Sequence, residues 1–201
     1  LDKIYRQNDD RFISILNNLR SRTLTSDNIA ALNERVKHNV RLEDGVFITT
    51  HNYKADRINE SMIMRISEPS FLHFAEVDGY FNEDSVMASG ELQLKKGMRV
   101  MTLVNVQDEY YNGKIGTITS VPESGKITVK FDDGGQSFID KYTWENVSME
   151  YDAEMQKFRR EVIGTFTQYP LKPAYAITVH KSQGLTFDKA ILDIHEVFAS
   201  G

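Results

Sequence analysis

Apolar residues recur every three or four positions in three stretches of the first 66 residues, a spacing that predicts helices with one buried face. We expect helices over residues 9–20, 26–37 and 52–66, with Asp9 or Asp10, then Ser26, then Asn52 as their N-terminal caps. The side chains expected to point inward are Phe12, Ile15, Leu16, Leu19, Ile29, Leu32, Val36, Ala55, Ile58, Met62 and Ile66. A β-branched run at 46–50 predicts a buried strand. Strand and helix therefore alternate, which favours an α/β layer.

The pattern changes near residue 95 to short apolar runs separated by tight turns. Apolar positions alternate with polar ones over 127–131, and the turn D-D-G-G follows at 132–135. This pattern predicts a small β-barrel over 105–150, with Tyr110, Tyr111 and Trp144 in its core or rim. Stacking of these aromatic rings on nucleic-acid bases is the alternative interpretation. Buried-strand patterns return at 175–179 and 190–194.

The predicted fold is thus α/β, a lobe of residues 1–104 and 151–201 into which the barrel 105–150 is inserted. The parallel sheet of the lobe is expected to hold strands near 46–50, 98–104, 175–179 and 190–194. Residues 67–93 mix apolar and acidic side chains without a clear period, and no element is predicted there.

The amino-acid composition excludes several classes of protein. The 201 residues are 40% hydrophobic and 26% charged, which excludes a disordered or collagen-like chain. There is no cysteine, so disulfides and thiolate metal sites are excluded, and the histidines show no metal-binding spacing. No apolar run is long enough for a membrane helix. The chain begins with Leu1 and shows no signal segment, so we expect a piece of a longer, bacterial-type cytoplasmic protein.

Charge constrains how the chain could bind nucleic acid. Lys and Arg number 24 and Asp and Glu 29, a formal charge of −5, and no segment is strongly basic. A general electrostatic binder usually has a basic stripe. Contact with a phosphate backbone would therefore depend on a few placed donors, such as hydroxyls, backbone N–H groups and single cations.

The segment richest in chemistry is Y-A-I-T-V-H-K-S-Q-G-L-T-F-D at 175–188. An apolar strand runs directly into Thr178, His180, Lys181 and Ser182, which are compact groups able to bind phosphate. Ligands of open α/β sheets bind at the carboxyl ends of strands, and Gly184 permits a tight turn. From the residue types alone, a solvated turn between two strands is an equally good interpretation.

This string resembles motif V of superfamily 1B DNA helicases, the Pif-type and RecD-like branch. Other segments resemble the same family in the same order. They are I-Y-R-Q-N-D-D-R-F at 4–12 (motif IV), F-I-T-T-H-N-Y-K-A-D-R-I-N at 47–59, L-K-K-G-M-R-V-M-T-L-V-N at 94–105 and Y-N-G-K-I-G-T-I at 111–118. The last two resemble the start of the SH3-like accessory domain called 2B.

The resemblance implies a RecA-like second lobe, 2A, of the P-loop NTPase type, with an SH3-like 2B insertion. Thr178, His180 and Ser182 would face the DNA backbone, and Lys181 would reach a phosphate. Gln183 and Gly184 would lie toward ATP. One loop would then touch both ligands, so that a change at ATP alters the grip on DNA. A hydrogen-bonded turn histidine and a solvated lysine are the alternatives for His180 and Lys181.

Three further residues have implied roles. Arg6 matches the arginine of motif IV, which reaches the γ-phosphate of ATP in this family; the alternative is a surface ion pair. An arginine there offsets charge in the transition state, because its planar fork stays charged. Gln7 would lie on the ATP side. Asn52 is expected to cap a helix, with a nucleic-acid contact as the other interpretation.

The implied activity is that of an ATP-dependent DNA helicase that moves 5′-to-3′ on single-stranded DNA. ATP and Mg²⁺ are expected as cofactors of the full-length protein, and none in this fragment. The chain has no G-x-x-x-x-G-K-[ST] loop and no recognisable Walker B strand, and it ends where motif VI is expected. We therefore expect the fragment alone to be inactive. Its partners would be single-stranded DNA and the upstream lobe of the same polypeptide, within a monomer.

Two alternatives stay open. The barrel segment also resembles generic SH3-like or KOW-like modules, which bind nucleic acid or protein without catalysis, so the α/β part could be a scaffold without a motor. The motor could also be fused to a nuclease, as in a relaxase-helicase. The natural substrate, its pathway and a preference for DNA over RNA are not readable from the residues.

Overall fold

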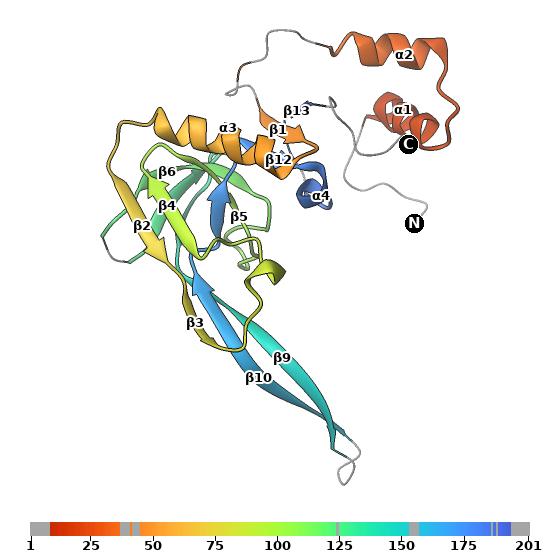
Figure 1. The fold of residues 1–201 in the computed structure, drawn as a ribbon. Coiled ribbons are helices and arrows are strands. Elements are labelled where there is room, and N and C mark those ends of the chain that lie inside the picture. Colours follow the sequence, from red (N-terminus) through yellow and green to blue (C-terminus); the bar gives the residue numbers. More distant parts are fainter. Residues whose placement is uncertain are drawn as a thin grey trace. The chain divides into compact units, whose positions relative to one another are not determined.

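The computed structural model describes residues 9–36, 41, 45–123, 125–152, 157–185, 187 and 189–193. The chain divides into two compact units, Leu1–Asp44 and Gly45–Gly201 (Figure 1). The predicted site residues Arg6 and Gln7 lie outside the described residues. The described part contains no helix that is both long and apolar enough to cross a membrane.

The first unit contains the helices α1 (Asp10–Arg20) and α2 (Ser26–Asn33). Asp9 caps α1, as predicted, by accepting a hydrogen bond from the N–H of Phe12. The cap of α2 is Thr25 and not Ser26, because Thr25 and Asn28 exchange side-chain and backbone hydrogen bonds in a capping box.

The predicted inner face of α1 is only partly buried. Ile15 is 5% exposed, but Phe12, Leu16 and Leu19 are 38%, 42% and 50% exposed. The expectation that these three form a core is wrong, because two helices of 11 and 8 residues offer too little surface to enclose them.

The second unit holds the predicted parallel sheet. Its order is β12-β1-β13, formed by β12 (Ala176–Thr178), β1 (Val46–Thr49) and β13 (Ala190–Leu192). Helix α3 (Asn52–Met64) follows β1 and packs against β1 and β12 (Figure 1). These elements confirm the expected strand–helix alternation. The helix turns Ala55, Met62 and Ile63 inward, together with the polar Asn59.

A five-stranded antiparallel sheet in the order β11-β5-β6-β7-β8 adjoins the parallel one. Its strands are β5 (Arg99–Thr102), β6 (Ile115–Ser120), β7 (Ile127–Phe131), β8 (Gln136–Ile139) and β11 (Leu171–Pro173). The predicted hairpin joins β7 to β8, with Gly134 at φ 92°. Tyr110 is buried and Tyr111 is 53% exposed.

The strand near 98–104 was predicted in the parallel sheet, and there the structure differs. It is β5, which pairs antiparallel with β6 and β11. Val100, Met101 and Thr102 are all nearly inaccessible to solvent. A strand buried on both faces reads as a continuous apolar run, the pattern that central parallel strands also show. The domain boundaries at 104/105 and 150/151 stay predictions.

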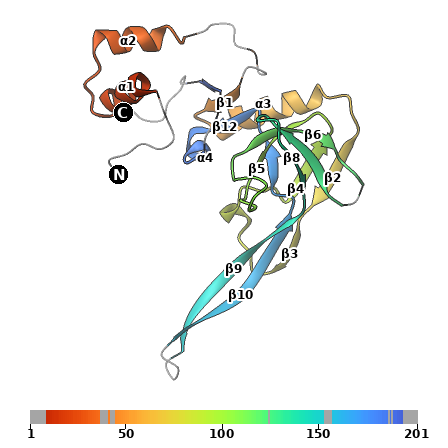
Figure 2. The ribbon, with the colours of Figure 1, turned by 180° about the vertical axis from the view of Figure 1, so that it is seen from behind.

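Residues 67–93, for which no element was predicted, form three strands and a turn of 3₁₀-helix. Strand β2 (Ser70–Phe74) pairs with β4 (Glu91–Lys95), and β3 (Glu76–Gly79) pairs with β10. The 3₁₀ turn covers Glu83–Ser85. Strands β9 (Tyr142–Asp152) and β10 (Lys157–Gln168) form a long antiparallel ribbon, and no other strand lies beside its outer half (Figures 1 and 2).

A hydrophobic core joins the parallel sheet to the five-stranded antiparallel sheet. Its buried members are Val46, Ile48, Ala88, Met101, Leu103, Phe166, Ala174 and Ile177. Trp144, Leu185 and Phe187 pack against it. Trp144 lies in β9, which pairs with β10, so its predicted place in the core or rim of the barrel stays a prediction. Residues 178–184 form the segment T-V-H-K-S-Q-G, which we call the T-V-H-K-S-Q-G loop. Because Leu185 follows this loop directly and packs against the core, the carboxyl end of the loop is fixed to the second unit.

Candidate nucleic-acid interface

The T-V-H-K-S-Q-G loop lies at the carboxyl end of the parallel strand β12. Thr178 is paired with Thr49 of β1 and is the N-terminal cap residue of α4 (Val179–Ser182), a single helical turn. Gly184 has φ 84°, the left-handed conformation that a tight turn requires of glycine. The predicted strand-to-turn transition is therefore confirmed.

Asn59 of α3 fixes the position of this loop. Its Nδ2 donates to the carbonyl of Ala176 at 2.9 Å, and its Oδ1 accepts from the N–H groups of Ala176 at 2.9 Å and Tyr175 at 3.1 Å. One buried amide thus binds helix α3 to the backbone of β12. Asn52 precedes Asn59 by seven residues, about two helical turns, so it lies on the same face of α3.

A pocket of about 260 Å³ lies between α3, β11, β12, α4 and the segment that leads into β4; we call it the α3–α4 pocket. The polar side chains that line it, besides Asn59, are Asn52, Asp56, Glu60, Lys172, Thr178, Lys181 and Ser89. Three predicted DNA-binding residues therefore meet here, namely Asn52, Thr178 and Lys181.

Four side chains of the pocket can donate hydrogen bonds to a ligand. Within the described residues, the structure records no side-chain hydrogen bond or ion pair for Asn52, Lys172, Thr178 or Lys181. Thr178 is only 4% exposed, and its hydroxyl forms no bond to the helix it precedes. Asn52 and Lys181 are exposed and Lys172 is half-buried, so water can satisfy these three, whereas the buried Thr178 hydroxyl is the donor for which a ligand partner is expected.

Lys172 was not predicted as a site residue. The pKa of Lys172 is lowered from 10.5 to about 8, chiefly by burial and also by the positive charge of Lys181, while the carboxylate of Asp56 acts in the opposite direction. The lysine follows Leu171 in β11 and opposes Met101 of β5. The only sequence signal is a cation placed close before the buried strand, and that signal does not say where the ammonium points.

Asn52 does not cap α3, contrary to the first interpretation of the sequence. The N-cap residue is His51, which makes no side-chain capping bond, and Asn52 is the first residue of the helix. The backbone turns one residue earlier than expected, which directs Asn52 toward the pocket. Asn52 therefore lies in the pocket lining, and the nucleic-acid contact stays a prediction.

The remaining loop residues lie outside the pocket lining. Ser182 donates its hydroxyl to the carbonyl of Val179 at 2.8 Å, so its side chain is engaged within α4. His180 and Gln183 are exposed. Leu185 packs where a β-carbon on Gly113 would lie, so this loop touches the predicted barrel.

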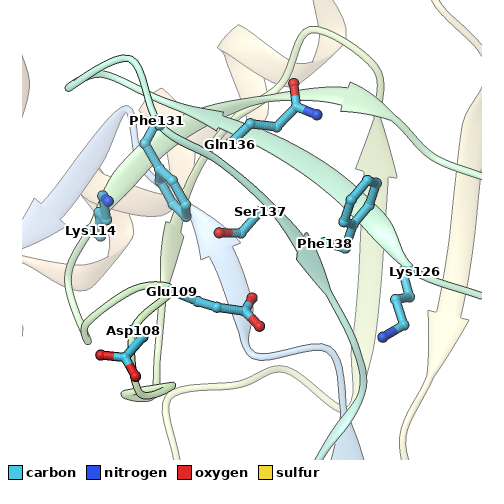
Figure 3. Close-up of a pocket in the computed structure, with 9 residues that line it drawn as sticks. Asp108, Glu109, Lys114, Lys126, Phe131, Gln136, Ser137 and Phe138 are labelled. Carbon is cyan, nitrogen blue, oxygen red and sulfur yellow. The ribbon is translucent and has the colours of Figure 1, made fainter.

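A second pocket, of about 440 Å³, lies on the predicted barrel between β7, β8 and residues 108–109 (Figure 3). Phe131, Ser137 and Glu109 face it, and it holds two lysines. The lysines are already neutralised. Lys114 pairs with Asp133 at 2.9 Å, and Lys126 pairs with Asp140 at 2.7 Å.

The carboxylates of this second pocket are not neutralised. Within the part of the chain that the structure describes, no ion pair is recorded for Asp108 or Glu109. The pocket is therefore negative overall and unsuited to phosphate, so the α3–α4 pocket is the better candidate for an anion.

Among the described residues, no group of three or more His, Cys, Asp and Glu side chains could hold a metal ion.

Comparison with known proteins gives a consistent result. The chain is 28% identical over 175 residues to ATP-dependent DNA helicase Pif1 of Campylobacter jejuni, an alignment that covers 79% of this chain and 38% of that protein. It is 26% identical over 202 residues to ATP-dependent DNA helicase Pif1 of Bdellovibrio bacteriovorus, covering 98% of this chain and 44% of that protein. The chain thus spans less than half the length of these relatives. No family model matches the chain.

A solved structure of a Pif1 helicase is also similar to this chain. The crystal structure of Bacteroides sp Pif1 in complex with ADP-AlF4 superposes with a TM-score of 0.89 at 35% identity, covering 98% of this chain and 46% of that chain.

Proposed function

We propose, from the homology of this chain to the Pif1 helicases of superfamily 1B over its whole length, that it is part of an ATP-dependent DNA helicase. Its α/β fold with a parallel sheet matches theirs. In this proposal the chain supplies the RecA-like lobe 2A and the inserted domain 2B, and the motor moves 5′-to-3′ along single-stranded DNA.

The observation that carries the proposal is the convergence of Asn52, Thr178 and Lys181 on one pocket at the carboxyl end of β12. A neutral amide, a hydroxyl and an ammonium are the groups that position a phosphate backbone without reading its sequence. Three such donors without protein partners match the sequence-based expectation of a few placed contacts in place of a basic stripe.

We propose that the loop couples DNA to ATP. Thr178, Lys181, His180 and Ser182 lie on the DNA side, and Gln183 and Gly184 lie on the nucleotide side. Because the loop is one turn of helix closed by a glycine at φ 84°, a shift of its carboxyl end moves the donors at its amino end. Binding at one ligand then changes the affinity for the other.

The nucleotide side is proposed to include Arg6 and Gln7. A guanidinium beside the γ-phosphate would stabilise the charge that develops there during phosphoryl transfer. ATP and Mg²⁺ would bind chiefly through a phosphate loop, and this sequence contains none. We therefore propose that the 201-residue chain alone neither hydrolyses ATP nor unwinds DNA.

The test is the ATPase rate of the full-length protein with and without single-stranded DNA. We expect strong stimulation by DNA, and a loss of about a thousandfold in Arg6→Ala. Lys181→Met should raise the DNA concentration needed for half-maximal stimulation about tenfold while the maximal rate is retained. The matched control is Lys130→Met, which removes an exposed lysine of β7 and should change neither quantity.

The opposite result has a defined meaning. Absence of ATP turnover under every condition would refute the motor and favour a binding module on a helicase-derived scaffold. Attention would then move to the predicted barrel and its negative pocket (Figure 3). Detectable, Arg6-dependent turnover by the 201-residue chain alone would contradict its proposed inactivity.

A further inference from the structure

Lys172 is a partly buried cation that has no counter-ion in the part of the chain the structure describes. Removing an ammonium from water is costly unless it is paired. Two carboxylates line the same pocket, Asp56 and Glu60 of α3, yet neither is recorded within ion-pair distance of Lys172. A second cation, Lys181 of α4, is close enough to lower the pKa of Lys172, and the carboxylate of Asp56 is close enough to offset part of that effect.

Two lysines that face one pocket repel each other and gain stability when an anion lies between them. The neighbouring donors, Asn52 and Thr178, have no acceptor of their own in the described part. Phosphate oxygens accept hydrogen bonds from all three donor types present here, the amide, the hydroxyl and the ammonium. The carboxylates of Asp56 and Glu60 also line the pocket and repel an anion, so a phosphate would have to lie nearer the two ammonium groups than the carboxylates.

We propose that Lys172 contacts a backbone phosphate of single-stranded nucleic acid, so that Lys172 and Lys181 hold that phosphate from β11 and α4 together. The proposal deepens the proposed function and rests on it. It adds to the T-V-H-K-S-Q-G loop a binding residue that lies outside the loop, on a strand of the antiparallel sheet. A single phosphodiester would then bridge the five-stranded sheet and the helical turn that follows the parallel strand β12.

The alternative is a structural lysine whose stem fills space and whose ammonium reaches water. Lysine side chains often behave in this way. The two roles make different predictions, because a structural lysine leaves the salt dependence of DNA binding unchanged. A phosphate contact contributes one released counter-ion, which is about 0.7 to the slope of log affinity against log salt for single strands.

The experiment is a titration of a fluorescent oligo(dT) with the 201-residue chain at several salt concentrations, at pH 7. Lys172→Met keeps the length of the stem and removes the charge. We expect it to weaken binding about tenfold and to reduce the salt slope by about 0.7. Lys172→Arg should retain both, and Lys130→Met, the control in an exposed strand position, should match the unaltered chain.

Two results overturn different statements. If the unaltered chain binds oligo(dT) and Lys172→Met behaves as Lys130→Met does, the inference about Lys172 is wrong and the proposed function stands. If the unaltered chain does not bind oligo(dT), the proposed DNA-binding role of the loop fails, and the inference fails with it.

A measurement on the unaltered chain removes dependence on how the variants fold. The Lys172 ammonium is followed by NMR during a pH titration, with its signal assigned by its absence in Lys172→Arg. Its pKa is about 8 in the free chain and should rise when oligo(dT) is added, because an anion favours the charged form. Inorganic phosphate at equal concentration should have little effect; an equal rise would indicate a site for free phosphate and contradict a backbone contact. An unchanged pKa with bound oligo(dT) would overturn the contact.

Discussion

Replacing Lys172 with methionine is expected to stabilise the free chain at pH 7, although it weakens the proposed contact with DNA. The pKa of Lys172 is 10.5 in its ordinary state and about 8 in the folded chain. At 1.36 kcal/mol per pH unit, this difference sets an upper limit of about 3 kcal/mol on the cost of the folded ammonium at neutral pH. Partial access to water reduces the expected gain in Lys172→Met to about 1–2 kcal/mol.

The sign of the pH dependence follows from the direction of the shift. Below pH 8 the lysine is protonated in both states, and the full cost is present. Between about pH 8 and 10.5 the unfolded chain holds a proton that the folded chain has released, so the free energy of unfolding rises with pH. Above 10.5 both states are neutral, and the advantage of the methionine variant disappears.

Urea denaturation at pH 7, 8, 9 and 10 measures this difference, with Lys130→Met as the control for the loss of one positive charge. Lys172→Met should unfold at higher urea than the control at pH 7, and the two curves should converge as the pH approaches 10. The reasoning would be refuted by a methionine variant that is no more stable than the control at pH 7, or by a gain that is independent of pH. Oligo(dT) should oppose the gain, because it stabilises the control, which is expected to bind it about tenfold more tightly than Lys172→Met, by the larger amount.

Three further variants test the packing around the pocket, each by urea denaturation. Asn59→Ala should cost about 2–4 kcal/mol, because it leaves main-chain groups of β12 without partners, whereas Asn52→Ala should cost under 0.5 kcal/mol; equal losses would contradict the role of Asn59. Thr49→Val should stabilise the chain by about 1 kcal/mol, since the buried Thr49 hydroxyl has no hydrogen-bond partner; a loss of stability would show that the hydroxyl is satisfied in solution. Phe166→Ala should cost about 3–5 kcal/mol, because this fully buried ring contributes to the core that joins the two sheets; a cost near 1 kcal/mol would mean that the core collapses around the gap.

The sequence predicts correctly those elements that are determined by residues close to one another in the chain. The β-branched run at 46–50 and the apolar segment before Thr178 predict parallel strands, and the structure pairs them as β1 and β12. Asp9 is recognised as a cap because capping is decided within four residues. The D-D-G-G turn is equally local, and it joins β7 to β8 as expected.

The sequence does not show which strands pair when they lie far apart in the chain. Strand β5 reads as a central parallel strand, but its neighbours are β6 and β11, and β11 lies about seventy residues farther along the chain. The strands in 67–93 also depend on distant partners, since β3 pairs with β10. No residue near these strands encodes which partner is available.

The same limit explains why three of the four pocket donors were predicted and Lys172 was not. Asn52, Thr178 and Lys181 belong to segments that resemble helicase motifs, so the resemblance implied a role for each of them. Lys172 acquires its meaning only when β11 pairs with β5 and Asn59 holds β12 beside it. Its charge then faces another cation, an arrangement that tertiary structure alone produces.

The geometry of the pocket implies that part of the stability of the fold is given up for binding. Asn59 is buried and makes three hydrogen bonds to the main chain at Tyr175 and Ala176, so it fixes α3 on β12 and keeps Asn52 and Thr178 in their relative positions without a ligand. Beside this rigid amide, Lys172 is held in a state that disfavours its own charge. A site of this kind loses little entropy when it binds an anion, because its donors are already placed. The proposed contact would relieve the unfavourable energy of the free state, and a substitution that relieves it beforehand should therefore strengthen the fold and weaken the binding of DNA.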